Sequence, residues 1–191
     1  MARRLIMKRP ATKRSETKRT PMSLASAVMA TMLAVAIIAS TAGTAAAGAS
    51  EETEIKALEY RFVAAVKAKD AEAIMANYLP GENLVVFDVI PPRQYDGAQA
   101  YKKDWEGVLA SCKGPVDFEL TELSVTADPK LGFGHNIQHL SCSTAGGKTV
   151  DLTFRVTDAY RKAGGKWLIV HEHVSVPVNI ATGKADLASK P

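Results

Sequence analysis

Three side chains in this sequence have the chemical type and the surroundings that acid–base chemistry requires. His171 and His173 lie two residues apart in Lys166–Pro177, a segment whose alternating residues predict a strand. Because imidazoles titrate near neutral pH, the pair could supply a general base and an orienting hydrogen-bond donor. Asp88 lies between apolar residues, where burial would raise its pKa. The structural alternatives are two histidines satisfied at the edge of the core and an aspartate that bonds the turn before Pro91-Pro92.

Strict alternation along this strand assigns its side chains to two faces. Trp167, His171, His173 and Ser175 share one face, and Glu172 belongs to the other. The site residues that we predict on this strand all belong to the first face, and the sequence leaves open which of the two faces lines the cavity.

The position of Arg155, in the preceding predicted strand, depends on the turn at Gly164-Gly165. A loop of two or four residues places Arg155 beside Glu172 as an ion pair. A three-residue loop with a bulge places it with His171 and His173 in the pocket instead. Both arrangements are compatible with the sequence.

Two further histidines, His135 and His139, share a face of another predicted strand. Four histidines on neighbouring strands raise the question of a metal site. The two pairs lie on strands separated by another strand, about 10 Å apart. The sequence has no H-E-x-x-H motif and no phosphate-binding glycine loop, so we expect neither a metal nor a cofactor.

Residues 1–47 have the pattern of a secretory signal peptide. Eight Lys or Arg residues and one Glu are followed by an uncharged run from Met22 to Ser50, and Ala45-Ala46-Ala47 fits a cleavage site. The sequence therefore predicts a periplasmic or secreted protein with no membrane association after cleavage. An uncleaved membrane anchor is the alternative, because the uncharged run is long enough to span a bilayer.

The basic character of the whole chain comes from this leader. The chain has a net charge of +4, and the leader has eight basic residues and one acid, so the remaining residues have a net charge of −3. This balance gives no reason to expect a nucleic-acid partner.

Export would place Cys112 and Cys142 in an oxidising compartment. A predicted hairpin of residues 116–126 and 132–142 brings the two cysteines close together, so we expect a disulfide. Two buried free thiols are the alternative.

The order of predicted elements indicates an α+β fold, with N-terminal helices packed on one face of a curved antiparallel sheet. Such a sheet can leave a conical pocket beneath the helices. We expect one domain over residues 48–178 and a flexible tail over 179–191. Helices are predicted at 51–69, after Asp70, and at 97–111, and strands at 84–88, 116–126, 131–142, 149–160 and 166–177.

This arrangement resembles the SnoaL-like branch of the nuclear transport factor 2-like superfamily. The most specific matches are Phe87-Asp88, the R-V-T-D-x-Y-R-K segment Arg155–Lys162, and Trp167–Pro177. The resemblance implies a cone-shaped α+β domain with a cavity, often dimeric through the outer face of its sheet.

Within this superfamily, ketosteroid isomerase offers a catalytic comparison. Asp88 corresponds to its proton-shuttling aspartate, but the oxyanion-binding tyrosine corresponds to Phe62 and the second aspartate falls near Thr157. Steroid isomerisation by that mechanism is therefore not expected.

From these observations we expect a homodimeric protein that binds a small, largely apolar molecule in its cavity. The alternative is a cofactor-free isomerase, lyase or hydrolase that uses Asp88 and His171 or His173 as general acid and base. A module that only assembles is a third hypothesis. The residues predicted to contact the ligand are Phe62, Trp105, His135, Arg155, Thr157, Trp167 and Ser175.

Overall fold

The computed structural model describes residues 48–188. The predicted signal peptide, residues 1–47, lies outside this range. Among the described residues, no helix has the length and apolar character needed to cross a membrane.

The described chain consists of three helices followed by long hairpins, with two short strands between α2 and α3. The first helix occupies residues 48–68, α2 is Ala71–Met75 and α3 is Ala98–Ser111. The strands are β1 (Val85–Phe87), β2 (Tyr95–Asp96), β3 (Cys112–Ala127), β4 (Leu131–Thr144), β5 (Thr149–Ala163), β6 (Lys166–Ser175), β7 (Val178–Asn179) and β8 (Lys184–Ala185).

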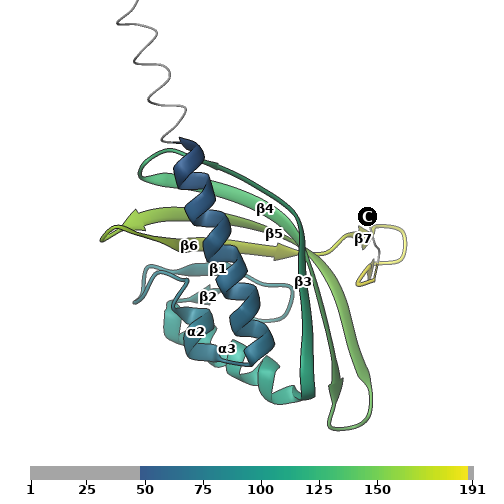
Figure 1. Ribbon diagram of the computed structural model, residues 1–191. Coiled ribbons are helices and arrows are strands. Elements are labelled where there is room, and N and C mark those ends of the chain that lie inside the picture. The colour runs from purple at the N-terminus through teal and green to yellow at the C-terminus, as the bar shows by residue number, and fades with distance from the viewer. Residues whose placement is uncertain (1–47, 189–191) are drawn as a thin grey trace, which may run out of the picture. The chain divides into compact units, whose positions relative to one another are not determined.

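Six of these strands form one curved sheet, in the order β2-β1-β6-β5-β4-β3. Neighbours from β3 to β6 are antiparallel, whereas β1 pairs with β6 in parallel, so the sheet is mixed. The helices gather on one side of this sheet, as Figure 1 shows. The predicted α+β class, with N-terminal helices on a curved sheet, is confirmed.

The first helix packs on the sheet through one apolar face. Ile55, Leu58, Phe62 and Val66 follow helical spacing, and all four are buried. The Phe62 ring contacts its aromatic neighbours edge-on. At the start of α2, the Asp70 carboxylate accepts a hydrogen bond of 2.9 Å from the backbone N–H of Ala73, the predicted N-cap.

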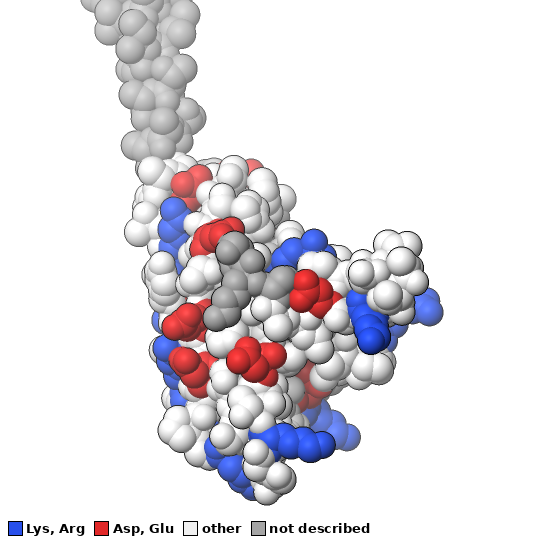
Figure 2. Space-filling model, turned by 90° about the vertical axis from the view of Figure 1, so that its right-hand side faces the viewer, with Lys and Arg blue, Asp and Glu red and all other residues white. Residues whose placement is uncertain are grey.

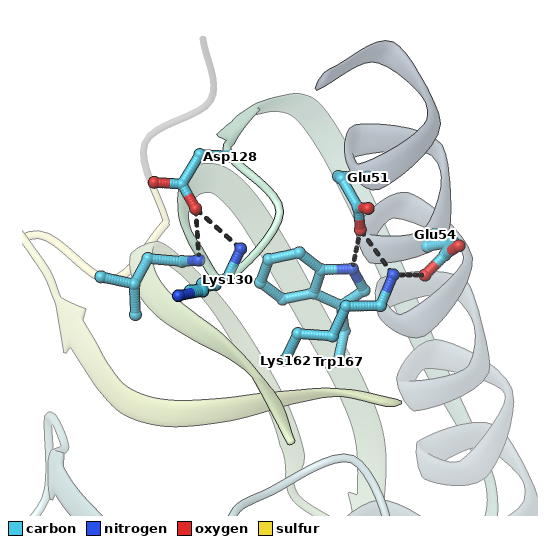
Figure 3. Close-up of polar contacts among 7 residues, drawn as sticks. Glu51, Glu54, Asp128, Lys130, Lys162 and Trp167 are labelled. Carbon is cyan, nitrogen blue, oxygen red and sulfur yellow. Dashed lines mark hydrogen bonds and ion pairs between the residues drawn. The ribbon is translucent and has the colours of Figure 1, made fainter. Parts of the chain in front are cut away.

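A salt-bridged cluster ties the first helix to the β5–β6 hairpin. The Glu51 Oε2 atom accepts hydrogen bonds from Lys162 Nζ at 2.7 Å and Trp167 Nε1 at 2.8 Å, and Lys162 also contacts Glu54 at 2.9 Å (Figure 3). The hydrogen bond from Lys162 lowers the pKa of Glu51 the most, and the hydrogen bond from Trp167 lowers it further. Trp167 therefore anchors the helix, although it was predicted to contact a ligand.

The β3–β4 turn is closed by Asp128. Its Oδ1 atom accepts hydrogen bonds from the backbone N–H groups of Lys130, at 2.7 Å, and Leu131, at 2.8 Å (Figure 3). These two bonds lower the pKa of the Asp128 carboxyl.

A β-bulge in β6 breaks the predicted alternation. Tyr160 pairs with Ile169 and Ala159 pairs with His171, so Val170 is an extra residue opposite no partner. Before the bulge, Ile169 faces the core, and after it Glu172 does. The prediction of strict alternation along this strand is therefore wrong.

The bulge also decides the position of Arg155. The β5–β6 loop has two residues, Gly164 and Gly165, which would place Arg155 on the same face as Glu172 if no bulge followed. Instead Arg155 pairs with Ser175 on the exposed face, and Glu172 pairs with Asp158. The Arg155–Glu172 ion pair, one of the two alternatives, is absent from the described part of the chain.

The residues after β6 form a small hairpin of β7 and β8. The backbone N–H of Thr153 donates to the carbonyl oxygen of Leu187 at 2.8 Å, which attaches this hairpin to β5. The described part of the predicted tail thus includes β8 and a backbone hydrogen bond to β5.

Candidate functional site

A cavity of about 190 Å³ lies between α3, the loop after β1, and strands β4 to β6. Its wall is mainly apolar but also contains residues with polar groups. The apolar residues are Val89, Ile90, Trp105, Val108, Leu140, Val150, Leu152, Phe154 and Val174. The carboxyl, phenol and amide groups belong to Asp88, Tyr101, Asp104, Gln138 and Glu172, and Ser111 and Cys112 complete the lining.

Regular spacing on each element brings these side chains together. On α3, Tyr101, Asp104, Trp105 and Val108 recur at three- and four-residue intervals and face the sheet. On β4 to β6 the lining residues recur every second position, as expected for one face of a sheet.

Asp88 is positioned by the short strand β1. Phe87 pairs with His173, and this is the last pair of the parallel β1–β6 ladder. Asp88 follows directly and lines the cavity. Its Oδ1 atom accepts a hydrogen bond of 2.5 Å from the backbone N–H of Val89. Burial raises the pKa of Asp88 to about 6, aided by the negative charge of Asp104 and opposed by the backbone hydrogen bonds. Asp88 thus lines the cavity and also accepts a hydrogen bond within the turn, as the structural interpretation predicts.

Asp104 lies on α3 within the same lining. Its Oδ1 atom accepts a hydrogen bond of 2.8 Å from the hydroxyl of Tyr95. Burial raises the pKa of Asp104, and the hydrogen bond from Tyr95 partly opposes that change.

Glu172 is buried at the inner wall of the cavity. Its carboxylate accepts hydrogen bonds from the hydroxyls of Tyr101, at 2.5 Å, and Tyr78, at 2.7 Å. Desolvation raises the pKa of Glu172 to about 7, although both tyrosines stabilise its charged form.

Two more buried carboxyl groups continue this network into the core. The Tyr160 hydroxyl donates to Glu59 at 2.7 Å and lies 3.4 Å from Asp158. Burial raises the pKa of Glu59 to about 7, and burial together with the charges of Glu59 and Glu172 holds that of Asp158 well above its usual range. We call Glu59, Asp158 and Glu172 the buried acid cluster. Each of its carboxyl groups therefore keeps its proton to a higher pH than an exposed carboxyl group does.

Comparison with known proteins places this architecture in a family. A model of the SnoaL-like domain matches residues 55–179. The chain belongs to the SnoaL-like family. Comparison with curated proteins gave no match.

Solved structures agree with this assignment. An NTF2-like protein of unknown function from Pseudomonas putida KT2440 is 34% identical, over 75% of this chain and 98% of that one, with a TM-score of 0.67. Two others share the fold at lower identity. A nuclear transport factor 2 (NTF2-like) superfamily protein from Salmonella enterica serovar Typhimurium LT2 has 15% identity over 71% of this chain and 97% of its own, with a TM-score of 0.63. A ketosteroid isomerase-like protein from Erwinia carotovora atroseptica SCRI1043 has 18% identity over 65% and 95%, with a TM-score of 0.56.

In this SnoaL-like domain, His171 and His173 lie on the opposite face of β6 from the cavity, because the bulge at Val170 turns them outward. The His171 Nδ1–H donates to the carbonyl oxygen of Val85 at 2.7 Å, and the Phe87 ring contacts both imidazoles edge-on. These contacts agree with the structural alternative, in which the two histidines find their partners at the edge of the core.

Of the predicted ligand contacts, only Trp105 lines the cavity. Phe62 lies in the core, and Trp167 binds Glu51. The others are on the outer face of the sheet, where His135 pairs with Thr157, Thr157 with His173, and Arg155 with Ser175.

Cys112 and Cys142 are joined by a disulfide in the structure, with their Cα atoms 5.6 Å apart. Cys112 lies directly after α3 and contributes to the cavity wall. The bond therefore connects the end of the cavity helix to β4.

No group of three or more His, Cys, Asp or Glu side chains within residues 48–188 is arranged to hold a metal ion. His139 instead contacts Asp151, with 2.9 Å between Nε2 and Oδ1. On the face shown in Figure 2, acidic and basic side chains are interspersed and no basic band crosses the surface.

Sequence reasoning missed the buried acid cluster, although one signal was present. Glu59 lies four residues after Ile55 and three before Phe62, so it occupies the apolar face of the first helix. An acid at such a position requires a buried partner, which here is Tyr160.

Proposed function

We propose that this SnoaL-like domain binds a small, mostly apolar molecule in the cavity beneath α3. The supporting observation is a cavity of about 190 Å³ with apolar walls and a few converging polar groups. Ligand pockets for drug-sized molecules span roughly 300–1,000 Å³, so the molecule proposed here is smaller than those. Homodimerisation and export stay predictions.

Filling the cavity should abolish this binding. The test ligand is benzyl alcohol, and binding is followed by chemical-shift changes of the Leu152 and Phe154 amides, which belong to the cavity wall. We expect Val108→Trp to lose these changes, because the indole would occupy the ligand volume.

The matched control is Val63→Trp, at a half-buried position of the first helix outside the cavity. It should bind benzyl alcohol as the unsubstituted protein does. Identical titrations of Val108→Trp and the unsubstituted protein would place the binding elsewhere. Circular dichroism checks that both variants are folded.

A second candidate function is cofactor-free acid–base catalysis, which is favoured by the position and pKa of Asp88. A carboxylate with a pKa of about 6 on the wall of an apolar cavity can accept a proton from a bound substrate at neutral pH. Since His171 and His173 lie outside the cavity, Asp88 is the proton acceptor in this proposal, and Tyr101 with Glu172 supplies the polar wall.

Proton abstraction can be tested with cyclohexanone in D₂O, because enolisation exchanges its α-hydrogens for deuterium. We expect the protein to accelerate this exchange and Asp88→Asn to reduce the acceleration about 100-fold or more, as for loss of a general base. Exchange is measured by NMR, and Glu106→Gln on the outer side of α3 serves as the control. Equal acceleration by Asp88→Asn and the unsubstituted protein would refute this second function.

A further inference from the structure

The cavity has acidic groups and no basic group to balance them. Its lining includes the carboxyl groups of Asp88, Asp104 and Glu172, and none of its residues is Lys, Arg or His. The negative charge of Asp104 acts on Asp88, and that of Asp88 acts on Glu172. The cavity therefore disfavours carboxylates, phosphates and other anions.

Within the described chain, none of these three carboxyl groups forms an ion pair. Asp88 receives a hydrogen bond from the backbone N–H of Val89, Asp104 one from the Tyr95 hydroxyl, and Glu172 two from Tyr78 and Tyr101. The donors to Asp88 and Asp104 are neutral, so the negative charge of these two carboxylates has no counter-ion, and a partly buried charge without a counter-ion is costly. A cation in the cavity would supply the missing partner.

A second polar group in the cavity points to a ligand independently. Gln138 on β4 is only 4% exposed and lines the cavity. No hydrogen bond joins its side-chain amide to another residue in the described range, so the amide can bond a ligand in the cavity. Its carbonyl oxygen can accept a hydrogen bond from a ligand N–H.

The rest of the wall matches the body of a small organic cation. Trp105 and Phe154 contribute aromatic rings. The face of such a ring can bind a cation, and it can also pack against an apolar group. Val108 and Leu152 add aliphatic surface.

We propose that the ligand of this cavity is a small protonated amine with a compact apolar body. The carboxylates of Asp88 and Asp104 hold the ammonium group, and the apolar body lies against Val108, Leu152 and Phe154. This inference rests on the proposed small-molecule binding function and defines the chemical class of its ligand.

The test compares three ligands that share a phenyl ring and differ in charge, on the purified full-length protein by isothermal titration calorimetry at pH 7.5. Benzylamine is a cation, benzyl alcohol is neutral and benzoate is an anion. We expect benzylamine to bind about ten-fold or more tightly than benzyl alcohol, and benzoate to bind more weakly than either. The double variant Asp88→Asn/Asp104→Asn should lose about ten-fold in benzylamine affinity while its benzyl alcohol affinity changes little.

The control variant is Glu106→Gln, which removes a negative charge from the outer side of α3 and should leave both affinities unchanged. Equal affinities for benzylamine and benzyl alcohol in the unsubstituted protein would overturn the amine inference and leave small-molecule binding standing. Binding of benzylamine that survives in Val108→Trp would show that the cation binds elsewhere and would also overturn it. Absence of binding by all three ligands would overturn both proposals.

Discussion

Unfolding of this protein should require more urea at pH 5 than at pH 8, with the midpoint falling as pH rises through about 7. The cause is the buried acid cluster, in which burial raises the pKa of Glu59 and Glu172 from 4.5 to about 7. Between these values the folded state keeps protons that the unfolded chain releases, so stability falls as pH rises. The stabilisation is fully present below about pH 4.5 and is lost by about pH 8.

The measurement is a series of urea unfolding curves followed by tryptophan fluorescence between pH 5 and pH 8. Glu59→Gln should lose a large part of the pH dependence, because an amide keeps an acceptor for the Tyr160 hydroxyl without titrating. Glu119→Gln, on the exposed side of β3, should behave as the unsubstituted protein does. Equal midpoints at pH 5 and pH 8 would contradict the assignment of raised pKa values to this cluster.

Removing the Cys112–Cys142 disulfide should destabilise the protein by about 3–4 kcal/mol. The bond closes a loop of 30 residues, and constraining a loop of that length in the unfolded chain is worth about this much. It also holds the end of α3 against β4 beside the cavity, where the Lys69 ammonium donates to the Cys112 carbonyl oxygen at 2.7 Å.

The double variant Cys112→Ala/Cys142→Ala avoids burying new hydroxyl groups at two buried positions. Its free energy of unfolding is compared with that of the unsubstituted protein, with and without dithiothreitol. Reducing agent should lower the stability of the unsubstituted protein and leave the variant unchanged. A difference below about 1 kcal/mol between the two oxidised proteins would argue against a stabilising cross-link.

Local patterns in the sequence were sufficient for the main elements of the fold. Helical spacing of apolar residues predicted the first helix and α3, and turn residues such as Gly164-Gly165 predicted the β5–β6 hairpin. The parallel pairing of β1 with β6 was not predicted, because three residues of β1 form their ladder with a strand far along the chain. No local pattern contains that information.

The site was only partly predictable, and one inserted residue explains much of the difference. Asp88 and Trp105 line the cavity, but the extra residue Val170 reverses the faces of β6 after Ile169. Both faces of β6 include apolar residues, so hydrophobic alternation could not reveal the bulge. The two histidines that were predicted to line a pocket therefore lie on the outer face of the sheet. Glu172 lines the cavity instead.

The β1–β6 ladder also bears on how the chain acquires its cavity during synthesis. Val85 and His171 lie 86 positions apart, and β1 has only the two-residue strand β2 as its other neighbour in the sheet. A ribosome therefore completes the first helix and three long strands before β1 has the partner that positions Asp88. A nascent chain that ends before Lys166 can form the β3–β5 hairpins, but it has no strand against which to place Asp88. Assembly of the cavity is thus a late event that depends on the last long strand to be made.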